Sequence, residues 1–157
     1  MELWHKGNLE DPKVLDQEGA LKEYLEILLE VCSAETSADP DNWTPENPLH
    51  GHCAVVALLV QKEFGGKLLR ASLDGVAGYE QMRSHYWNEL LNGSEVDLTA
   101  KQFRGNDRDL VPPGSNLKDG RMITPESLLE NPLTKNRYEL LRNRIDKRWD
   151  EKYGVKE

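Results

Sequence analysis

Apolar residues recur at helical spacing near the start of the chain. Asp11-Pro12 offers an N-cap followed by a proline at the first helical position. The apolar positions that follow are three or four residues apart: Ala20, Leu21, Tyr24, Leu25, Leu28 and Val31. The pattern predicts a helix over about residues 13 to 33. Cys32 lies on or beside its apolar face, so we expect a small buried hydrophobe rather than a reactive thiol.

A second helix is predicted to lie in the middle of the core. The segment from Cys53 to Phe64 is apolar on nearly every side until Gln61, and Gly65-Gly66 follows it. A helix that is apolar all round is typical of an element covered by its neighbours. We therefore expect this helix to begin at Cys53 and to be buried.

Three short segments predict β-strands after that helix. Residues 67 to 73 are short and apolar enough for one strand, and residues 74 to 78 read as a turn. Residues 84 to 91 and 94 to 99 flank Asn92-Gly93, which is the strongest short-range hairpin signal in the chain. The sequence thus predicts a small sheet that contains one hairpin.

The two longest polar stretches differ in character. Residues 33 to 50 contain several proline turns, but Trp43 and Leu49 need packing partners, which predicts an ordered loop. Residues 104 to 120 are rich in Asp, Gly, Pro and Asn, which predicts an exposed connection.

Two helices are predicted at the end of the chain. Thr124 can cap a short helix that ends near Asn131-Pro132, and a longer helix is expected over about residues 134 to 151. The longer helix has apolar residues at spacings of three or four: Tyr138, Leu141, Ile145 and Trp149. Its other face is rich in lysine and arginine, interrupted by acidic residues. We interpret it as a solvated surface with pairs inside the helix.

Length and composition favour a single domain that spans residues 1 to 157. They also argue against nucleic acid and a membrane as partners. Of the 157 residues, 38% are hydrophobic, which is enough to form a core. A formal charge of −8 argues against nucleic acid as a partner. No apolar run is long enough to span a membrane, and the acidic start lacks the order of a signal peptide. We expect a cytoplasmic protein with two free thiols; the oligomeric state stays open.

Cys53 is the candidate nucleophile. A cysteine attacks a carbonyl carbon as the thiolate, and the first turn of a helix favours negative charge through its free N–H groups and dipole. The same N–H groups can hold the oxyanion of a tetrahedral intermediate. Core filling is the alternative for this residue, but the polar Gly51-His52 approach indicates a helix end rather than a helix middle.

His85 and Asp97 are the candidate base and orienting acid. A carboxylate bonded to one imidazole nitrogen leaves the other nitrogen to take the thiol proton. A strict two-residue loop at Asn92-Gly93 would send the two side chains to opposite faces, whereas a three-residue loop or a bulge would restore a common face. The alternatives are a structural histidine and an aspartate that only pins the hairpin.

These residues resemble two protein families. Gly51-His52-Cys53, then His85-Tyr-Trp, and then Asp97-Leu-Thr99 are similar to the Cys, His and Asp motifs of papain-like and transglutaminase-like cysteine enzymes. From about Trp43 to the final helix, the chain resembles more closely the YunG-like family of small bacterial proteins. The resemblance implies a papain-like α+β fold: a central helix starting at the cysteine, a small antiparallel sheet, and flanking N- and C-terminal helices.

The resemblance also implies positions for substrate contacts. Papain-like enzymes place a glutamine ahead of the cysteine as oxyanion donor, and this chain offers His52, His50 or Asn47 there. Independently of the resemblance, Tyr86 and Trp87 alternate on the predicted strand, so one of them is expected to pack in the core and the other to line a cleft; we take Trp87 as the candidate for substrate contact.

The leading hypothesis is a thiol-dependent hydrolase or acyltransferase with a Cys53-His85-Asp97 triad, without cofactor or metal. It would act on an amide or ester bond of a small-molecule or peptide acyl substrate. The alternatives are an inactive binding module on the same scaffold and a metal site among His50, His52, Cys53 and His85.

Overall fold

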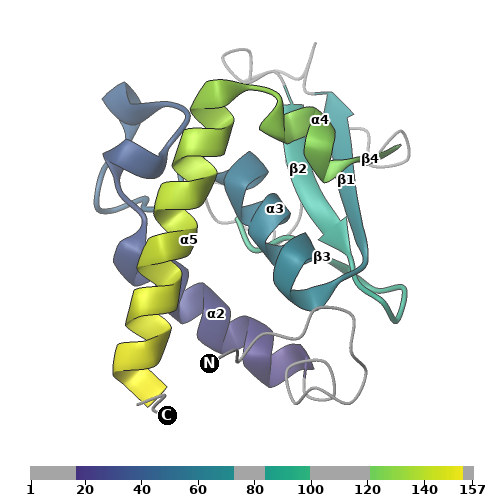
Figure 1. The fold of residues 1–157 in the computed structure, drawn as a ribbon, viewed down its shortest axis with the longest axis horizontal. Helices are drawn as coiled ribbons and strands as arrows, with labels where there is room; N and C mark the ends of the chain where they lie inside the picture. Colours follow the sequence, from purple (N-terminus) through teal and green to yellow (C-terminus); the bar gives the residue numbers. More distant parts are fainter. Residues whose placement is uncertain (1–16, 73–83, 100–120, 154–157) are drawn as a thin grey trace.

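Helix α3 (Cys53–Phe64) lies between a small sheet and the other long helices (Figure 1). The computed structural model describes residues 17–72, 84–99 and 121–153. The other helices are α2 (Gln17–Val31), the 3-10 turns η1 (Ala34–Thr36) and η2 (Pro40–Asn42), α4 (Pro125–Leu129) and α5 (Pro132–Tyr153). The strands are β1 (Lys67–Ser72), β2 (Ser84–Glu89), β3 (Glu95–Val96) and β4 (Arg121–Ile123). The described part of the chain is therefore an α+β arrangement.

Helix α3 has the bounds and the burial that its sequence predicts. Every residue from Val55 to Val60 is buried, as are Glu63 and Phe64 near the end of the helix. The helix ends because Gly65 adopts a φ of 77° and donates its N–H to Gln61 O at 2.9 Å. α3 packs against β2 on one side and α5 on the other, so the helix is covered from two directions.

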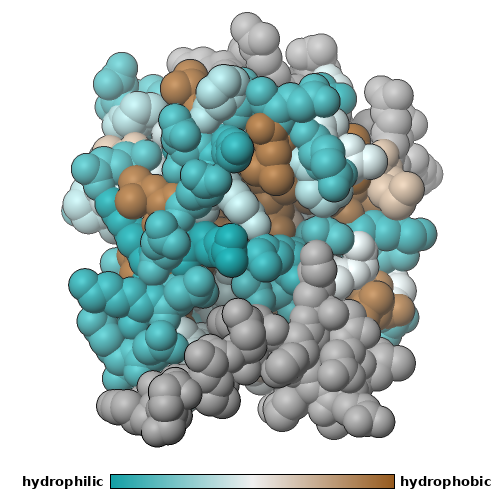
Figure 2. Space-filling model, in the orientation of Figure 1, coloured by the Kyte–Doolittle hydropathy of each residue, from teal (hydrophilic) through white to brown (hydrophobic). Residues whose placement is uncertain are grey.

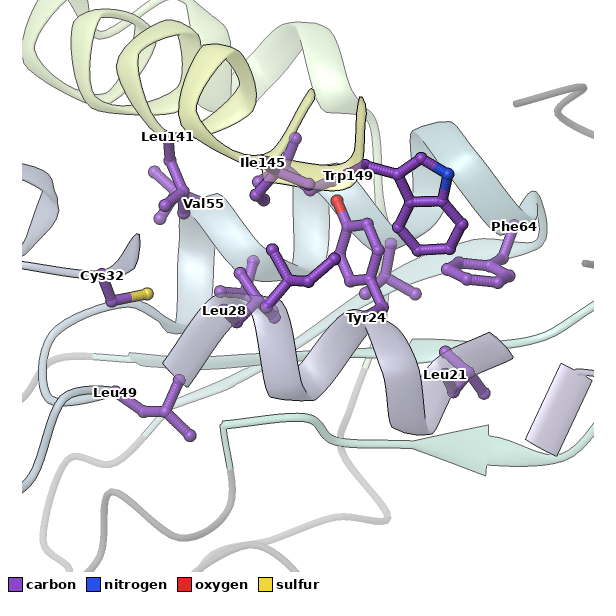
Figure 3. Close-up of a cluster of buried hydrophobic side chains, with 14 of the residues drawn as sticks. Leu21, Tyr24, Leu28, Cys32, Leu49, Val55, Phe64, Leu141, Ile145 and Trp149 are labelled. Carbon is purple, nitrogen blue, oxygen red and sulfur yellow. The ribbon is translucent and has the colours of Figure 1, made fainter. Parts of the chain in front are cut away.

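The main core is formed where α2, α3 and α5 meet (Figure 3). Figure 3 labels ten of its side chains: Leu21, Tyr24, Leu28, Cys32, Leu49, Val55, Phe64, Leu141, Ile145 and Trp149. Tyr24 and Phe64 meet edge to face, with ring centroids 5.6 Å apart. Cys32 is buried as expected, and burial raises the pKa of its thiol to about 12.

The sheet is antiparallel throughout, in the order β3-β2-β1-β4. β1 pairs with β2 along its full length, from Lys67 opposite Glu89 to Ser72 opposite Ser84. β4 was not predicted: it has only three residues, too few for a strand pattern, and it exists because it pairs with β1. Strand formation here depends on a partner far away in the sequence.

The β2–β3 hairpin closes through a three-residue loop, Leu91 to Gly93. Leu90 N donates to Ser94 O at 2.7 Å, and Gly93 has a φ of 89°. Asn88 consequently lies opposite Val96 rather than Asp97. If this register continues by one position, Asp97 lies opposite Trp87. Trp87 and His85 are two residues apart and share one face of the sheet, so Asp97 lies on that face as well. The expected difficulty of opposite faces therefore does not arise.

Several element ends differ from those predicted. α2 ends at Val31 rather than residue 33, because Ser33 caps the 3-10 turn η1. β3 ends at Val96 rather than residue 99, since the Asp97 carboxylate accepts from Thr99 N at 3.2 Å and forms a turn. The expectations for residues 13–16, 74–78 and 104–120 lie outside the described residues.

The two C-terminal helices are capped by side chains. Thr124 Oγ1 accepts from Ser127 N at 3.2 Å at the start of α4, as predicted. α5 begins at Pro132, two residues earlier than expected, because Asn131 Oδ1 accepts from Leu133 N at 2.9 Å. Among the described residues, no helix is long and apolar enough to cross a membrane.

The basic face of α5 pairs mainly with acidic residues of the N-terminal half. Arg148 Nε lies 2.5 Å from Glu30 Oε1, and Lys152 Nζ lies 3.3 Å from Glu23 Oε1 on α2. Pairs within the helix, which we expected, also occur, as between Arg142 and Asp146 at 4.0 Å. Figure 2 shows that the face carrying α5 is mainly hydrophilic, with smaller apolar patches.

The turn after α3 provides a test of backbone packing. A Cβ at Gly66 would lie 2.1 Å from Glu89 O, whereas a Cβ at Gly93 meets nothing within 4 Å. Both glycines have positive φ, so Gly66→Ala and Gly93→Ala share the conformational strain. We expect Gly66→Ala to lower the free energy of unfolding by about 1–3 kcal/mol more than Gly93→Ala does, measured in urea. Equal losses would contradict the close approach of the two segments.

Candidate active site

Cys53 lies at the first position of α3, beside the start of β2. Its side chain is 8% exposed, and Sγ lies 4.0 Å from Ser84 O. The first backbone bond of the helix runs from Val56 N to His52 O at 2.9 Å. By helical geometry, the N–H groups of Cys53, Ala54 and Val55 have no carbonyl of their own helix to bind. The location favours negative charge at the sulfur.

His85 and Asp97 form a buried ion pair at the entrance of the hairpin. His85 Nε2 lies 2.6 Å from Asp97 Oδ2, and the two side chains are 0% and 4% exposed. The other carboxylate oxygen of Asp97 accepts from Thr99 N at 3.2 Å and from Thr99 Oγ1 at 3.3 Å. These contacts fix the orientation of the carboxylate and, through it, of the imidazole.

The surroundings of His85 favour its protonated form. Burial alone would lower the pKa of His85, but hydrogen bonds with Asp97 and Cys53, and the charges of both groups, raise it to about 10. Asp97 occupies Nε2 of the ring, and Cys53 Sγ lies 4.0 Å from the carbonyl oxygen of Ser84, the residue before His85. Cys53 and Asp97 are thus both close enough to influence the same buried imidazole.

Trp87 covers the imidazole instead of lining a cleft. Its ring stacks on His85 with centroids 5.9 Å apart and planes inclined at 15°. It is 3% exposed, and its Nε1 donates to Glu95 Oε1 at 3.0 Å. Trp87 does not line the pocket beside Cys53, since strand alternation turns it away from the face that carries Tyr86 and Asn88.

His52 points into the protein rather than toward the thiol. Its Nδ1 lies 2.9 Å from His50 O and its Nε2 lies 2.6 Å from Thr36 Oγ1. A carbonyl oxygen only accepts, so Nδ1 carries the proton and Nε2 accepts from the Thr36 hydroxyl. Burial lowers the pKa of His52 to about 4. His52 therefore clamps the loop before α3, and both nitrogens expected to serve an oxyanion are occupied.

The open side of the site is a pocket of about 600 Å³. Residues of the ordered loop, the start of α3 and the sheet line it: Ala38, Asp39, Asn42, His50, Gly51, Cys53, Ala54, Arg70, Ser84 and Tyr86. His50 belongs to this wall as expected, and its Nε2 lies 2.8 Å from Asp39 Oδ2. Asn47 is not among these residues; its backbone closes a turn with Thr44.

Sequence reasoning missed the other polar residues of the pocket. Asp39 and Asn42 belong to a loop whose course no periodicity predicts. Arg70 and Tyr86 lie directly opposite each other on β1 and β2. Only the strand register reveals that this pair shares one face, and register cannot be obtained from a short apolar segment alone.

No group of three or more His, Cys, Asp or Glu side chains within the described residues is arranged to hold a metal ion. His52 uses both ring nitrogens within the protein, and His85 gives one to Asp97. The described part of the chain therefore offers no support for the proposed metal site.

The free energy of unfolding should decrease in acid because His52 is buried in its neutral form. The unfolded chain binds a proton at this residue below about pH 6.5, whereas the folded protein does so only near pH 4. Stability is therefore lost as the pH falls between these values, by about 3 kcal/mol from this group. In His52→Gln, the difference in unfolding free energy between pH 7 and pH 4.5 should shrink by about 2 kcal/mol or more. His50→Gln is the matched control, and an equal change in both variants would contradict the assignment.

The comparisons with known proteins agree on one family. A family model described as YunG protein matches residues 20–150. A protein of Bacillus subtilis (strain 168), named Uncharacterized protein YunG, is 36% identical over 62 residues. That match covers 40% of this chain and 47% of the relative, so it spans about half of the relative's length. No solved structure matches.

Proposed function

The chain belongs to the YunG protein family, and we propose that it performs thiol-dependent acyl chemistry with Cys53 as nucleophile. His85 would act as base and acid, and Asp97 would orient it. The observation that carries the proposal is a buried imidazole, His85, that lies 2.6 Å from the Asp97 carboxylate and directly follows Ser84, whose carbonyl oxygen lies 4.0 Å from Cys53 Sγ. The interaction with Cys53 also helps to raise the pKa of His85. A buried imidazolium next to a thiol at a helix start is the arrangement expected of an activated cysteine.

The proposed reaction begins with attack of the Cys53 thiolate on an amide or ester carbonyl. The S–C bond forms, and the π electrons of the carbonyl move to its oxygen. As the tetrahedral intermediate collapses, the bond to the leaving group breaks and His85 gives its proton to that group. Water or an amine then attacks the thioester, gives a proton to His85, and releases the thiolate. Water makes the protein a hydrolase and an amine makes it a transferase.

Donors for the oxyanion are available in the first turn of α3. The N–H groups of Cys53 and Ala54 precede the first helical hydrogen bond, and both residues line the pocket. His50 adds a donor only when both ring nitrogens carry protons, since Asp39 takes the hydrogen of Nε2. The backbone is therefore the main oxyanion donor in this proposal.

The papain-like architecture is part of the same proposal. It is supported by a buried helix that begins at the cysteine, a small antiparallel sheet that carries the histidine, and flanking helices α2 and α5. The substrate would be a small molecule or peptide with an acyl group that enters the 600 Å³ pocket. The alternative function is a binding module without turnover. The burial of His85 favours this alternative, because a buried base has little access to a substrate.

Acyl transfer to p-nitrophenyl acetate distinguishes these readings. The proposal predicts a burst of p-nitrophenolate and one acetyl group on Cys53, located by peptide mapping. The burst should be absent in Cys53→Ala, and its rate should be about 100-fold lower in His85→Gln. Acetylation of Cys53 no faster than that of N-acetylcysteine would contradict the proposal and favour a binding module.

A further inference from the structure

Arg70 is the one arginine or lysine among the described residues that line the pocket containing Cys53. Strand alternation places Arg70 on the same face of β1 as Leu68, which packs against Ala57 and Leu58 of α3. Across the sheet, Arg70 lies directly opposite Tyr86, and both residues line the pocket (Figure 1 shows the two strands). The guanidinium therefore belongs to the wall formed by the sheet, on the side of the sheet where α3 packs.

Arg70 differs from the other charged groups of this pocket in its partners. Asp39, which also lines the pocket, accepts from His50 Nε2 and from Asn42 Nδ2, and the hydrogen bond with His50 lowers its pKa. Arg70, by contrast, is half-buried and forms no ion pair with any residue that the structure describes. A half-buried guanidinium gains most from a carboxylate or phosphate, because its planar fork can bind two oxygens at once.

We infer that Arg70 binds a carboxylate of the acyl substrate, one residue or its equivalent away from the carbonyl that Cys53 attacks. The inference rests on the proposed function of Cys53. Ser84, next to the thiol, and Tyr86 are two positions apart on β2, and Arg70 lies one strand further. The Cα atoms of Ser84 and Arg70 are thus roughly 8 Å apart by strand geometry, which an arginine side chain can span. A monoanion is favoured over a dianion because Asp39 faces the same space.

A pair of alkylating probes tests this selectivity at the cysteine itself. N-iodoacetylglycine and N-iodoacetylglycinamide differ only in a carboxylate or an amide about one residue from the reacting carbon. In both, the S–C bond forms and iodide leaves. The quantity measured is the rate ratio, which is the alkylation rate with the carboxylate probe divided by the rate with the amide probe. In the Cys32→Ala background at low ionic strength, we expect this ratio to be about 10-fold higher for Cys53 than for N-acetylcysteine.

The variants separate a specific contact from general charge. Arg70→Gln should bring the rate ratio close to that of N-acetylcysteine, and Arg70→Lys should give an intermediate ratio because it keeps the charge without the fork. Lys67→Gln is the matched control: Lys67 is an exposed cation on the same strand, paired with Glu89 at 3.6 Å. This variant should leave the ratio unchanged.

The possible results lead to different conclusions. A ratio unchanged in both Arg70 variants, with Cys53 still reactive, would overturn the carboxylate site and leave the proposed function standing. Faster reaction of a phosphonate analogue of the acidic probe would overturn the preference for a monoanion. Failure of wild-type Cys53 to react with any probe faster than N-acetylcysteine would overturn both proposals.

Discussion

Replacing Asp97 by asparagine should lower the alkylation rate of Cys53 at pH 7 by about 100-fold and the free energy of unfolding by about 3 kcal/mol. The carboxylate is 4% exposed and lies 2.6 Å from His85 Nε2. Asparagine keeps the shape and can still accept from Thr99 N, but it lacks the charge that helps raise the pKa of His85. The buried imidazolium would lose its counter-ion, and Cys53 would lose its protonated partner.

Glu95→Gln provides the matched control on the same hairpin. Glu95 accepts from Trp87 Nε1 at 3.0 Å, but it is exposed and does not contact His85. We expect this variant to change the alkylation rate less than about 3-fold. Iodoacetamide kinetics and urea unfolding measure the two effects. Equal losses in Asp97→Asn and Glu95→Gln, or no loss in either, would show that the ion pair does not govern the thiol.

Phe64→Ala should lower the free energy of unfolding by about 3–5 kcal/mol. Phe64 is fully buried at the end of α3, and its ring meets Tyr24 edge to face at 5.6 Å. Removing the ring leaves a cavity between α2 and α3 that the surrounding helices can fill only in part.

Leu133→Ala is the control for the loss of apolar atoms. Leu133 is 65% exposed near the start of α5, so its truncation should change stability by less than about 0.5 kcal/mol. Urea unfolding of both variants at pH 7 gives the comparison. A loss below about 1 kcal/mol for Phe64→Ala would contradict the tight packing of α3 against α2.

The helical part of the fold could be predicted because its signals are local. The segment that begins at Cys53 is apolar on nearly every side until Gln61 and is followed by two glycines, and both features are local signals. Thr124 could be identified as a cap for the same reason. The candidate residues of the site could also be predicted, since a cysteine at a helix start and a histidine before a hairpin can be recognised in the sequence.

What could not be predicted depends on register and on distant contacts. A change from a two-residue to a three-residue loop at Leu91 to Gly93 moves Asp97 to the face of His85, and the Asn92-Gly93 signal does not distinguish them. The role of His52 depends on Thr36, sixteen residues earlier in the chain. Arg70 could be assigned to the site only from its position opposite Tyr86 in the sheet, which the sequence does not reveal.

The pH dependence of Cys53 alkylation tests the central claim most directly. A thiolate paired with His85, whose pKa is raised to about 10, should react with iodoacetamide at nearly the same rate at pH 6 and pH 8. The measurement uses Cys32→Ala as background, and the plateau should disappear in His85→Gln. An ordinary thiol loses about 10-fold in rate for each pH unit below its pKa of about 8.5. A rate that falls in this way in the wild-type protein would contradict the thiolate–imidazolium pair.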